Sequence, residues 1–154
     1  MKIYLDTNIF CRPFDNQSQK RIRNEAIAFL EIIENVINKK LFLISSEILE
    51  FEIGKIKNFE KRIKVSDFLS LASDVIYGTK EQLRISNKLE QKYNLKGHDA
   101  LHVAAAFLGK AEYMITCDDL LLEKVWVISS FTKEEGFEIK LINPISFLKV
   151  LKGE

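Results

Sequence analysis

The chain has 154 residues, of which 47% are hydrophobic and 29% are charged, the composition of an ordinary soluble globular protein. Its 23 basic and 22 acidic residues leave a formal net charge of +1, which excludes binding of nucleic acid through a strongly basic overall field. No apolar run approaches the roughly 20 residues that span a bilayer, and no signal peptide is evident. Cys11 and Cys117 give neither a disulfide framework nor a zinc spacing. We therefore expect one cytoplasmic domain, residues 1–154, that does not contact membranes.

The first half of the chain alternates short apolar runs with amphipathic segments. The elements expected there, in chain order, are a strand at 2–5, a turn at 12–16, a helix at 20–38, a strand at 41–44, and helices at 47–57 and 59–72. The first helix is expected because apolar residues recur every three or four positions, and Asn16 or Ser18 would cap it. The continuous apolar run at 41–44 is typical of a buried parallel strand, and Ser45-Ser46 offers the next cap.

The second half continues the same alternation. A short strand at 74–77, a helix that ends near Tyr93, an Ala-rich helix that stops at Gly109, strands at 113–116 and 138–142, and a closing helix are expected. Thr79 and Gln82 match a capping box, and Asn143-Pro144 is a cap followed by a first-turn proline. Strands that alternate with helices predict right-handed crossovers and a parallel sheet covered on both faces. The fold class is therefore α/β, a three-layer α/β/α sandwich.

Four acidic residues are predicted at one edge of this sheet. Asp6 and Asp118 follow strands, whereas Glu52 and Asp99 lie near the starts of helices. Each alone has an ordinary explanation, such as a turn, a helix cap or a solvated helix face. Together they would repel, because two carboxylates ~4 Å apart cost roughly 4 kcal/mol at an effective dielectric of about 20. A divalent cation would relieve that repulsion, and its common use is phosphodiester hydrolysis.

Five segments of the chain resemble a known family, and the resemblance runs from residue 1 to about 148. MKIYLDTNIF, SSEILEFEI, GHDALHVAAA, MITCDDLLL and LINPISFL are similar to the successive blocks of PIN-domain ribonucleases, which include the toxins of VapC-type toxin–antitoxin pairs. The resemblance implies a Mg²⁺- or Mn²⁺-dependent endoribonuclease that cuts single-stranded RNA. Its metal-site acids would be Asp6, Glu52, Asp99 and Asp118. It also implies that an antitoxin protein and a homodimer are candidate partners.

Two of these acids have a neighbour that competes for the same role. Glu50 lies two residues before Glu52, and on a helix only one of the two can point into the site. Asp119 adjoins Asp118 in the same way. The sequence favours Glu52 and Asp118 but leaves both choices open.

Other patterns allow different functions. HDALH contains His98 and His102 at the spacing of a zinc-hydrolase pair, although packed helix residues are the simpler interpretation. A phosphatase of the aspartyl-phosphate type would need a second aspartate at the position of Asn8. A PIN-like module that binds RNA or protein and cleaves poorly is the main alternative.

Two basic clusters could hold substrate phosphates. One occupies residues 55–64, and the other comprises Arg12, Lys20, Arg21 and Arg23. A solvated helix face is the more common explanation of such a run. Phe14 and Phe59 could stack on bases or pack in the core.

Overall fold

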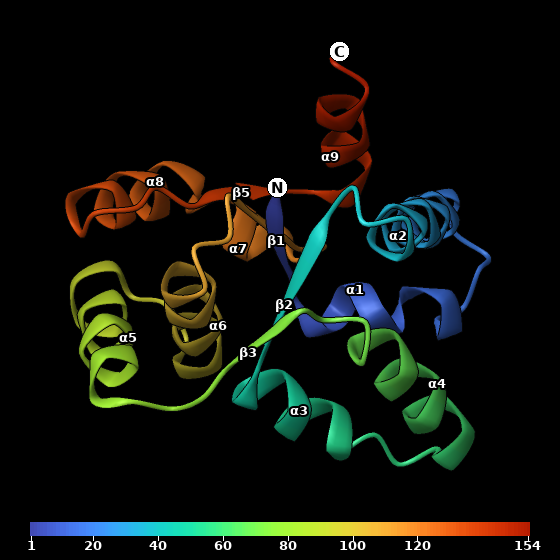
Figure 1. Cartoon of the computed structure of the whole chain (residues 1–154), viewed down its shortest axis with the longest axis horizontal. Coiled ribbons are helices and arrows are strands. Elements are labelled where there is room, and N and C mark those ends of the chain that lie inside the picture. Colours follow the sequence, from blue (N-terminus) through green and yellow to red (C-terminus); the bar gives the residue numbers. More distant parts are fainter.

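A sheet of five parallel strands forms the centre of the molecule in the computed structural model, which describes all 154 residues (Figure 1). The strands are β1 (Lys2–Leu5), β2 (Phe42–Ser46), β3 (Asp74–Ile76), β4 (Tyr113–Ile115) and β5 (Lys140–Ile142). They lie in the order β3-β2-β1-β4-β5, with Tyr4 of β1 in register with Ile44 of β2 and Met114 of β4. All five expected strands are present, and their ends differ from the expected ones by at most two residues.

Helices cover both faces of this sheet. After β1 come α1 (Thr7–Cys11), the 3-10 helix η1 (Arg12–Phe14) and α2 (Lys20–Ile37); after β2 come α3 (Glu47–Gly54) and α4 (Phe59–Leu69). The remaining helices are α5 (Lys80–Tyr93), α6 (Gly97–Leu108), α7 (Asp119–Leu122), α8 (Val125–Glu134) and α9 (Pro144–Leu151). Figure 1 shows α1, α2, α4 and α9 on one side of the strands and α5, α6 and α8 on the other. This is the expected three-layer α/β/α sandwich.

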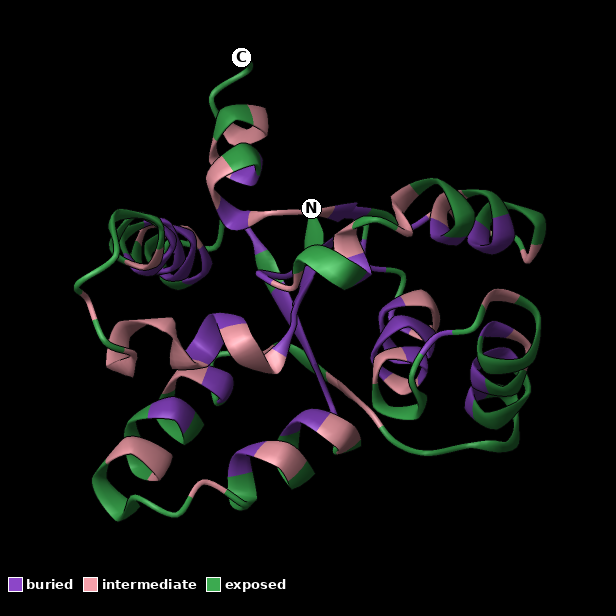
Figure 2. Ribbon diagram, turned by 180° about the vertical axis from the view of Figure 1, so that it is seen from behind, coloured by how far each residue is buried: buried purple, intermediate pink, exposed green.

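The core lies between the sheet and the inner faces of the helices, where Figure 2 shows the buried parts of the ribbon. On α2 the expected apolar stripe is buried at Phe29 and Ile33, but Ile37 in its last turn is 58% exposed. On α4, Phe59 and Ile63 are exposed, whereas Val65 and Leu69 are buried. Apolar residues near the ends of these helices extend beyond the area that the sheet covers.

Polar caps place most of the helix starts. The side chains of Ser46, Thr79 and Asn143 accept backbone N–H groups at the starts of α3, α5 and α9, as expected. The predicted cap of α2 was wrong: the helix begins at Lys20 as expected, but no side chain caps its first turn, and Asn16 instead accepts from the backbone N–H of Ser18. These caps fix where the chain leaves each strand and enters the next helix.

Several features were not expected from the sequence. The short helices α1, α7 and α8 are additional, and Trp126 on α8 is 81% exposed. Close packing of α6 on the sheet depends on Gly109, because a Cβ there would lie 2.6 Å from Cγ2 of Ile44. None of the helices combines the length and apolar character that crossing a membrane requires.

The strand order creates one position where the chain reverses its direction of winding. The chain moves outward from β1 through β2 to β3 and then returns to β4, on the other side of β1. In such sheets the ligand crevice lies beyond the carboxyl ends of the strands at that point. Asp6 directly follows β1, and Asp118 follows β4. The fold therefore brings residues far apart in sequence to one edge.

Candidate active site

Asp6 is the most firmly held of the predicted acids. It is only 6% exposed and caps α1, accepting from the backbone N–H of Thr7 at 2.8 Å. Its second oxygen accepts from Oγ1 of Thr116 at 2.8 Å and from Nδ2 of Asn8 at 3.2 Å. Three donors therefore fix the orientation of this carboxylate at the end of β1.

Asn8 joins the ends of β1 and β4. Its Oδ1 accepts from the backbone N–H of Cys117 at 3.1 Å, and its Nδ2 also donates to Oγ1 of Thr116. The same threonine oxygen accepts from the backbone N–H of Asp118. Asn8 thus connects the two strand ends by hydrogen bonds. It also occupies the position where a phosphatase of the aspartyl-phosphate type would need an aspartate.

Asp99 and Asp118 line one cavity of about 210 Å³ between the start of α6 and α7, with Lys96 and Lys124 among its other walls. Oδ1 of Asp118 caps α7, whereas Oδ2 receives no hydrogen bond from the protein. Burial raises the pKa of Asp99, and the nearby carboxylates of Asp6 and Asp118 raise it further. Excess negative charge therefore surrounds Asp99.

Glu52 reaches the same edge from α3. Its Oε1 accepts from Oγ1 of Thr7 at 2.6 Å and from Nε2 of His102 at 2.5 Å. Burial opposes ionisation of this carboxyl group, but the two hydrogen bonds outweigh it, so the pKa of Glu52 lies below its usual value. His102 also lies 3.7 Å from Asp6.

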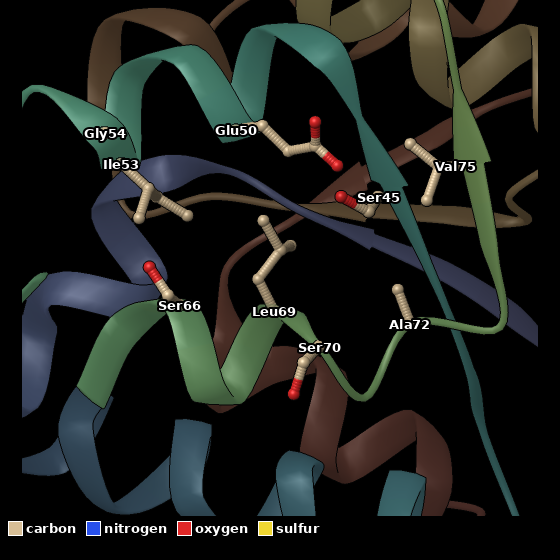
Figure 3. Close-up of a pocket in the computed structure, with 9 residues that line it drawn as sticks. All are labelled: Ser45, Glu50, Ile53, Gly54, Ser66, Leu69, Ser70, Ala72 and Val75. Atoms are coloured by element: carbon tan, nitrogen blue, oxygen red, sulfur yellow. The ribbon is translucent and has the colours of Figure 1, made fainter. Parts of the chain in front are cut away.

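Glu50 does not lie with these residues. Figure 3 shows its side chain in a separate cavity between α3, α4 and the β2–β3 edge, where it points toward Ser45. Glu52 instead contacts Thr7, which directly follows Asp6. Of the two glutamates, only Glu52 belongs to the acidic edge.

Asp119 is likewise directed away from the site. It is exposed, and both of its oxygens accept from the guanidinium of Arg21 at 2.7 Å. Arg21 also donates to the carbonyl oxygen of Cys117. Asp119 therefore fixes the loop after β4, while Asp118 lines the cavity with Asp99.

The two histidines occupy different environments. His98 is exposed in the first turn of α6, whereas His102 is 1% exposed. Both ring nitrogens of His102 are engaged, Nδ1 with the Tyr4 hydroxyl and Nε2 with Glu52. No lone pair of His102 is therefore left for a zinc ion. The contact with Glu52 was not predicted, although His102 lies three residues after Asp99 and so on the same side of the helix.

The donor set fits a hard divalent cation that keeps part of its water shell. No three acidic, histidine or cysteine side chains are close enough, as they stand, to enclose a metal by themselves. Mg²⁺ rarely needs that, since it usually takes one or two carboxylates directly and retains several waters. Asp99 and Oδ2 of Asp118, which receive no internal hydrogen bond, are suited to that role.

The predicted basic clusters divide into two groups. Arg12, Arg21 and Arg23 are engaged in internal ion pairs or bonds to carbonyl groups. Lys61 and Lys64 have no ion-pair partner and line a surface cavity with Phe14, Asn58 and the single acid Glu60. This cavity lies on α4, which packs against α1 just after Asp6. Phe14 packs partly against the core, and Phe59 is exposed.

Comparison with known proteins identifies the class. The sequence profile of the PIN domain matches residues 3–126, and the chain therefore belongs to the PIN domain family. Proteins of this family are typically nucleases that use divalent metal ions. No curated protein matches the chain.

A solved structure shares the fold. It is the crystal structure of VapBC2 from Rickettsia felis bound to a DNA fragment from their promoter. The match has 18% sequence identity and a TM-score of 0.52, and it covers 92% of this chain and 98% of that one. At this identity the likeness supports the fold alone.

Proposed function

We propose that the protein is a cytoplasmic Mg²⁺- or Mn²⁺-dependent endoribonuclease that hydrolyses single-stranded RNA and is the toxin of a toxin–antitoxin pair. The observation that supports this most directly is the charge imbalance at the sheet edge. Asp6, Glu52, Asp99 and Asp118 meet there, and His102 is the only basic group hydrogen-bonded to any of these carboxylates. A bound divalent cation would supply the missing positive charge and lower the pKa of water for attack on phosphorus.

The four acids would have different tasks. Asp6 is held by three donors and would keep a fixed carboxylate at the centre of the site. Asp99 and Asp118 have free oxygens and would bind the cation or orient the attacking water. Glu52 has one oxygen engaged and one free, so it can accept a further hydrogen bond or a metal contact.

The cavity that contains Lys61 and Lys64 would hold the substrate strand beside the acids. Lysine side chains bind phosphates without reading sequence, and the adjacent half-buried Phe14 offers a ring edge to a base. The affinity for RNA would then depend strongly on salt concentration.

The partner in this proposal is an antitoxin protein, by analogy with the VapBC2 complex of the same fold. A homodimer remains a prediction.

The first experiment is cleavage of a labelled single-stranded RNA in EDTA, Mg²⁺ or Mn²⁺. We expect metal-dependent cutting by the wild type and none by Asp6→Asn, because the substitution removes a central negative charge but keeps a capping side chain. Asp119→Asn is the matched control and should cut normally, since Asp119 pairs with Arg21 outside the site.

Cleavage by Asp6→Asn at the wild-type rate would refute the assignment. A folded wild type that binds RNA but cuts no RNA with any metal would favour the alternative, a PIN-like binding module. Growth arrest on expression, relieved by the product of an adjacent reading frame, would support the toxin role.

A further inference from the structure

A line of hydrogen bonds crosses the core and ends at the candidate site. The Tyr4 hydroxyl lies 2.7 Å from Oγ of Ser46 and 2.6 Å from Nδ1 of His102, and Nε2 of His102 lies 2.5 Å from Glu52. Ser46 also accepts from the backbone N–H of Leu49 in α3. The line therefore joins β2, β1, α6 and α3.

Every link in this line has a donor and an acceptor. Nε2 of His102 faces the carboxylates of Glu52 and Asp6, which only accept, so Nε2 carries a proton. In the neutral ring, Nδ1 accepts from Tyr4, whose oxygen accepts from the hydroxyl of Ser46. A fully satisfied buried network of this kind rigidifies its members.

Only one end of this line of hydrogen bonds is accessible to solvent. Tyr4, Ser46 and His102 are at most 1% exposed, whereas the Glu52 side chain is 26% exposed. Apolar side chains would fill the same core space without the cost of burying polar groups. The line thus has one accessible end, and that end is the carboxylate of Glu52.

We propose that Tyr4 and His102 are positioning residues that hold Glu52 in place for metal binding. Oε1 of Glu52 accepts from both His102 and Thr7, which leaves Oε2 as the oxygen available to the cation or its waters. Partners behind a metal ligand commonly change metal affinity by about 10- to 100-fold when removed. This inference rests on the proposed function, because it assumes a metal at the acidic edge.

The test measures binding of Mn²⁺ to RNA-free protein by electron paramagnetic resonance. His102→Leu removes the donor to Glu52 and should weaken binding about tenfold or more. His102→Gln keeps an N–H group and should recover most of the affinity. Tyr4→Phe removes only a hydroxyl and should give a smaller loss, whereas Tyr113→Phe, away from the site, should give none.

A double-mutant cycle separates positioning from a general loss of structure. If His102 acts through Glu52, then His102→Leu should cause no further loss of Mn²⁺ affinity in a Glu52→Gln background. An equal loss in both backgrounds, or wild-type affinity in folded His102→Leu, would overturn the inference. If His102→Leu does not fold, the nearly isosteric Tyr4→Phe replaces it in the same double-mutant cycle. Losses of Mn²⁺ affinity that are additive between Tyr4→Phe and Glu52→Gln would then overturn the inference.

The two hypotheses fail differently. A wild type that binds Mn²⁺ and cuts RNA, with variants that do both equally well, would refute only the positioning role. A wild type that binds no Mn²⁺ would refute the proposed function and this inference together.

Discussion

Two regions of the molecule bury carboxylates, and they differ in whether basic side chains neutralise those carboxylates. Glu25 in α2 is fully buried, and its oxygens accept from Arg12 at 3.1 Å and from Asn143 at 2.7 Å, with Arg21 at 3.5 Å. At the acidic edge, four carboxylates share one histidine. The carboxylate of the first region is neutralised by arginine, whereas no arginine or lysine pairs with the four acids of the second. Under the proposed function, the presence of a basic partner, and not the residue type, distinguishes the structural carboxylate of Glu25 from the carboxylates of the site.

The substitution Asp99→Asn tests the difference between the two regions most directly. We expect cleavage of RNA to fall at least about 100-fold, since the neutral amide no longer attracts the cation. The free energy of unfolding in EDTA should stay the same or rise, because a repelling charge has been removed. Single-turnover cleavage and urea denaturation measure the two effects. A large loss of stability would mean that Asp99 is structural after all.

The converse change is Glu25→Gln, which leaves Arg12 without its buried anionic partner. Loss of one member of a buried pair typically costs 3–5 kcal/mol, and we expect about 3 kcal/mol because Arg12 is partly exposed. Urea denaturation checks this. The cleavage rate of the folded fraction should remain within a few-fold of wild type; a rate as low as that of Asp99→Asn would place Glu25 in the site.

A moderate effect is expected for the substrate surface. Charge reversal of Lys61 and Lys64 together should weaken RNA binding about tenfold at low salt and reduce the slope of log affinity against log salt by roughly 1.4. Binding of labelled RNA by a variant that carries Asp6→Asn avoids cleavage during the measurement. Lys40→Glu, an exposed control before β2, should change neither quantity. If Lys40→Glu weakens RNA binding as much as the charge reversal at Lys61 and Lys64, RNA is attracted non-specifically by the positive charge of the protein.

The smallest effect concerns pH. Hydrogen bonds and nearby carboxylates raise the pKa of His102 above its usual value of 6.5 despite burial, so its contribution to stability is complete below that value and is lost as pH rises through the folded-state pKa. The pKa of Glu52 is lowered, so this residue stabilises the fold fully above the usual pKa of 4.5 and loses that contribution only in stronger acid. Asp99, with a raised pKa, destabilises the fold once ionised.

Together these shifts predict that the melting temperature in EDTA is highest near pH 5–6 and falls by a few degrees toward pH 8. Mg²⁺ at pH 8 should restore it, because the cation relieves the repulsion around Asp99. Thermal denaturation across this range is the measurement. A melting temperature that rises from pH 6 to 8 without metal would contradict the charge imbalance.

Much of the fold was predictable from local patterns. The continuous apolar run that begins near Leu41 and the caps at Ser46 and Asn143 place strands and helix starts, because burial and capping act over a few residues. The cap of α2 was predicted wrongly, although its start was not, because Gln19 makes no side-chain capping interaction that a sequence could reveal. The helices α7 and α8 were not predicted. Their apolar residues Leu120 and Trp126 are exposed, so apolar positions there do not recur with the spacing of a buried helix face.

The candidate site was predictable as a set of acids but not as a network. Asp6 and Asp118 follow from strand ends, and the preference for Glu52 over Glu50 agrees with their positions in the structure. The contact of His102 with Glu52 joins residues from different helices, and no local spacing encodes it. The same holds for the ion pair of Arg21 with Asp119, which lies 98 residues later in the chain.

The pairing of β1 with β4 has a consequence for the biosynthesis of the protein. Ile3 is in register with Tyr113, and Thr116 donates to Asp6 across that junction, so the first acid is held in place by residues made more than a hundred positions later. A ribosome-bound fragment that ends before β4 lacks both this donor and Asp118. The nascent chain therefore cannot assemble the acidic edge until most of it has been translated.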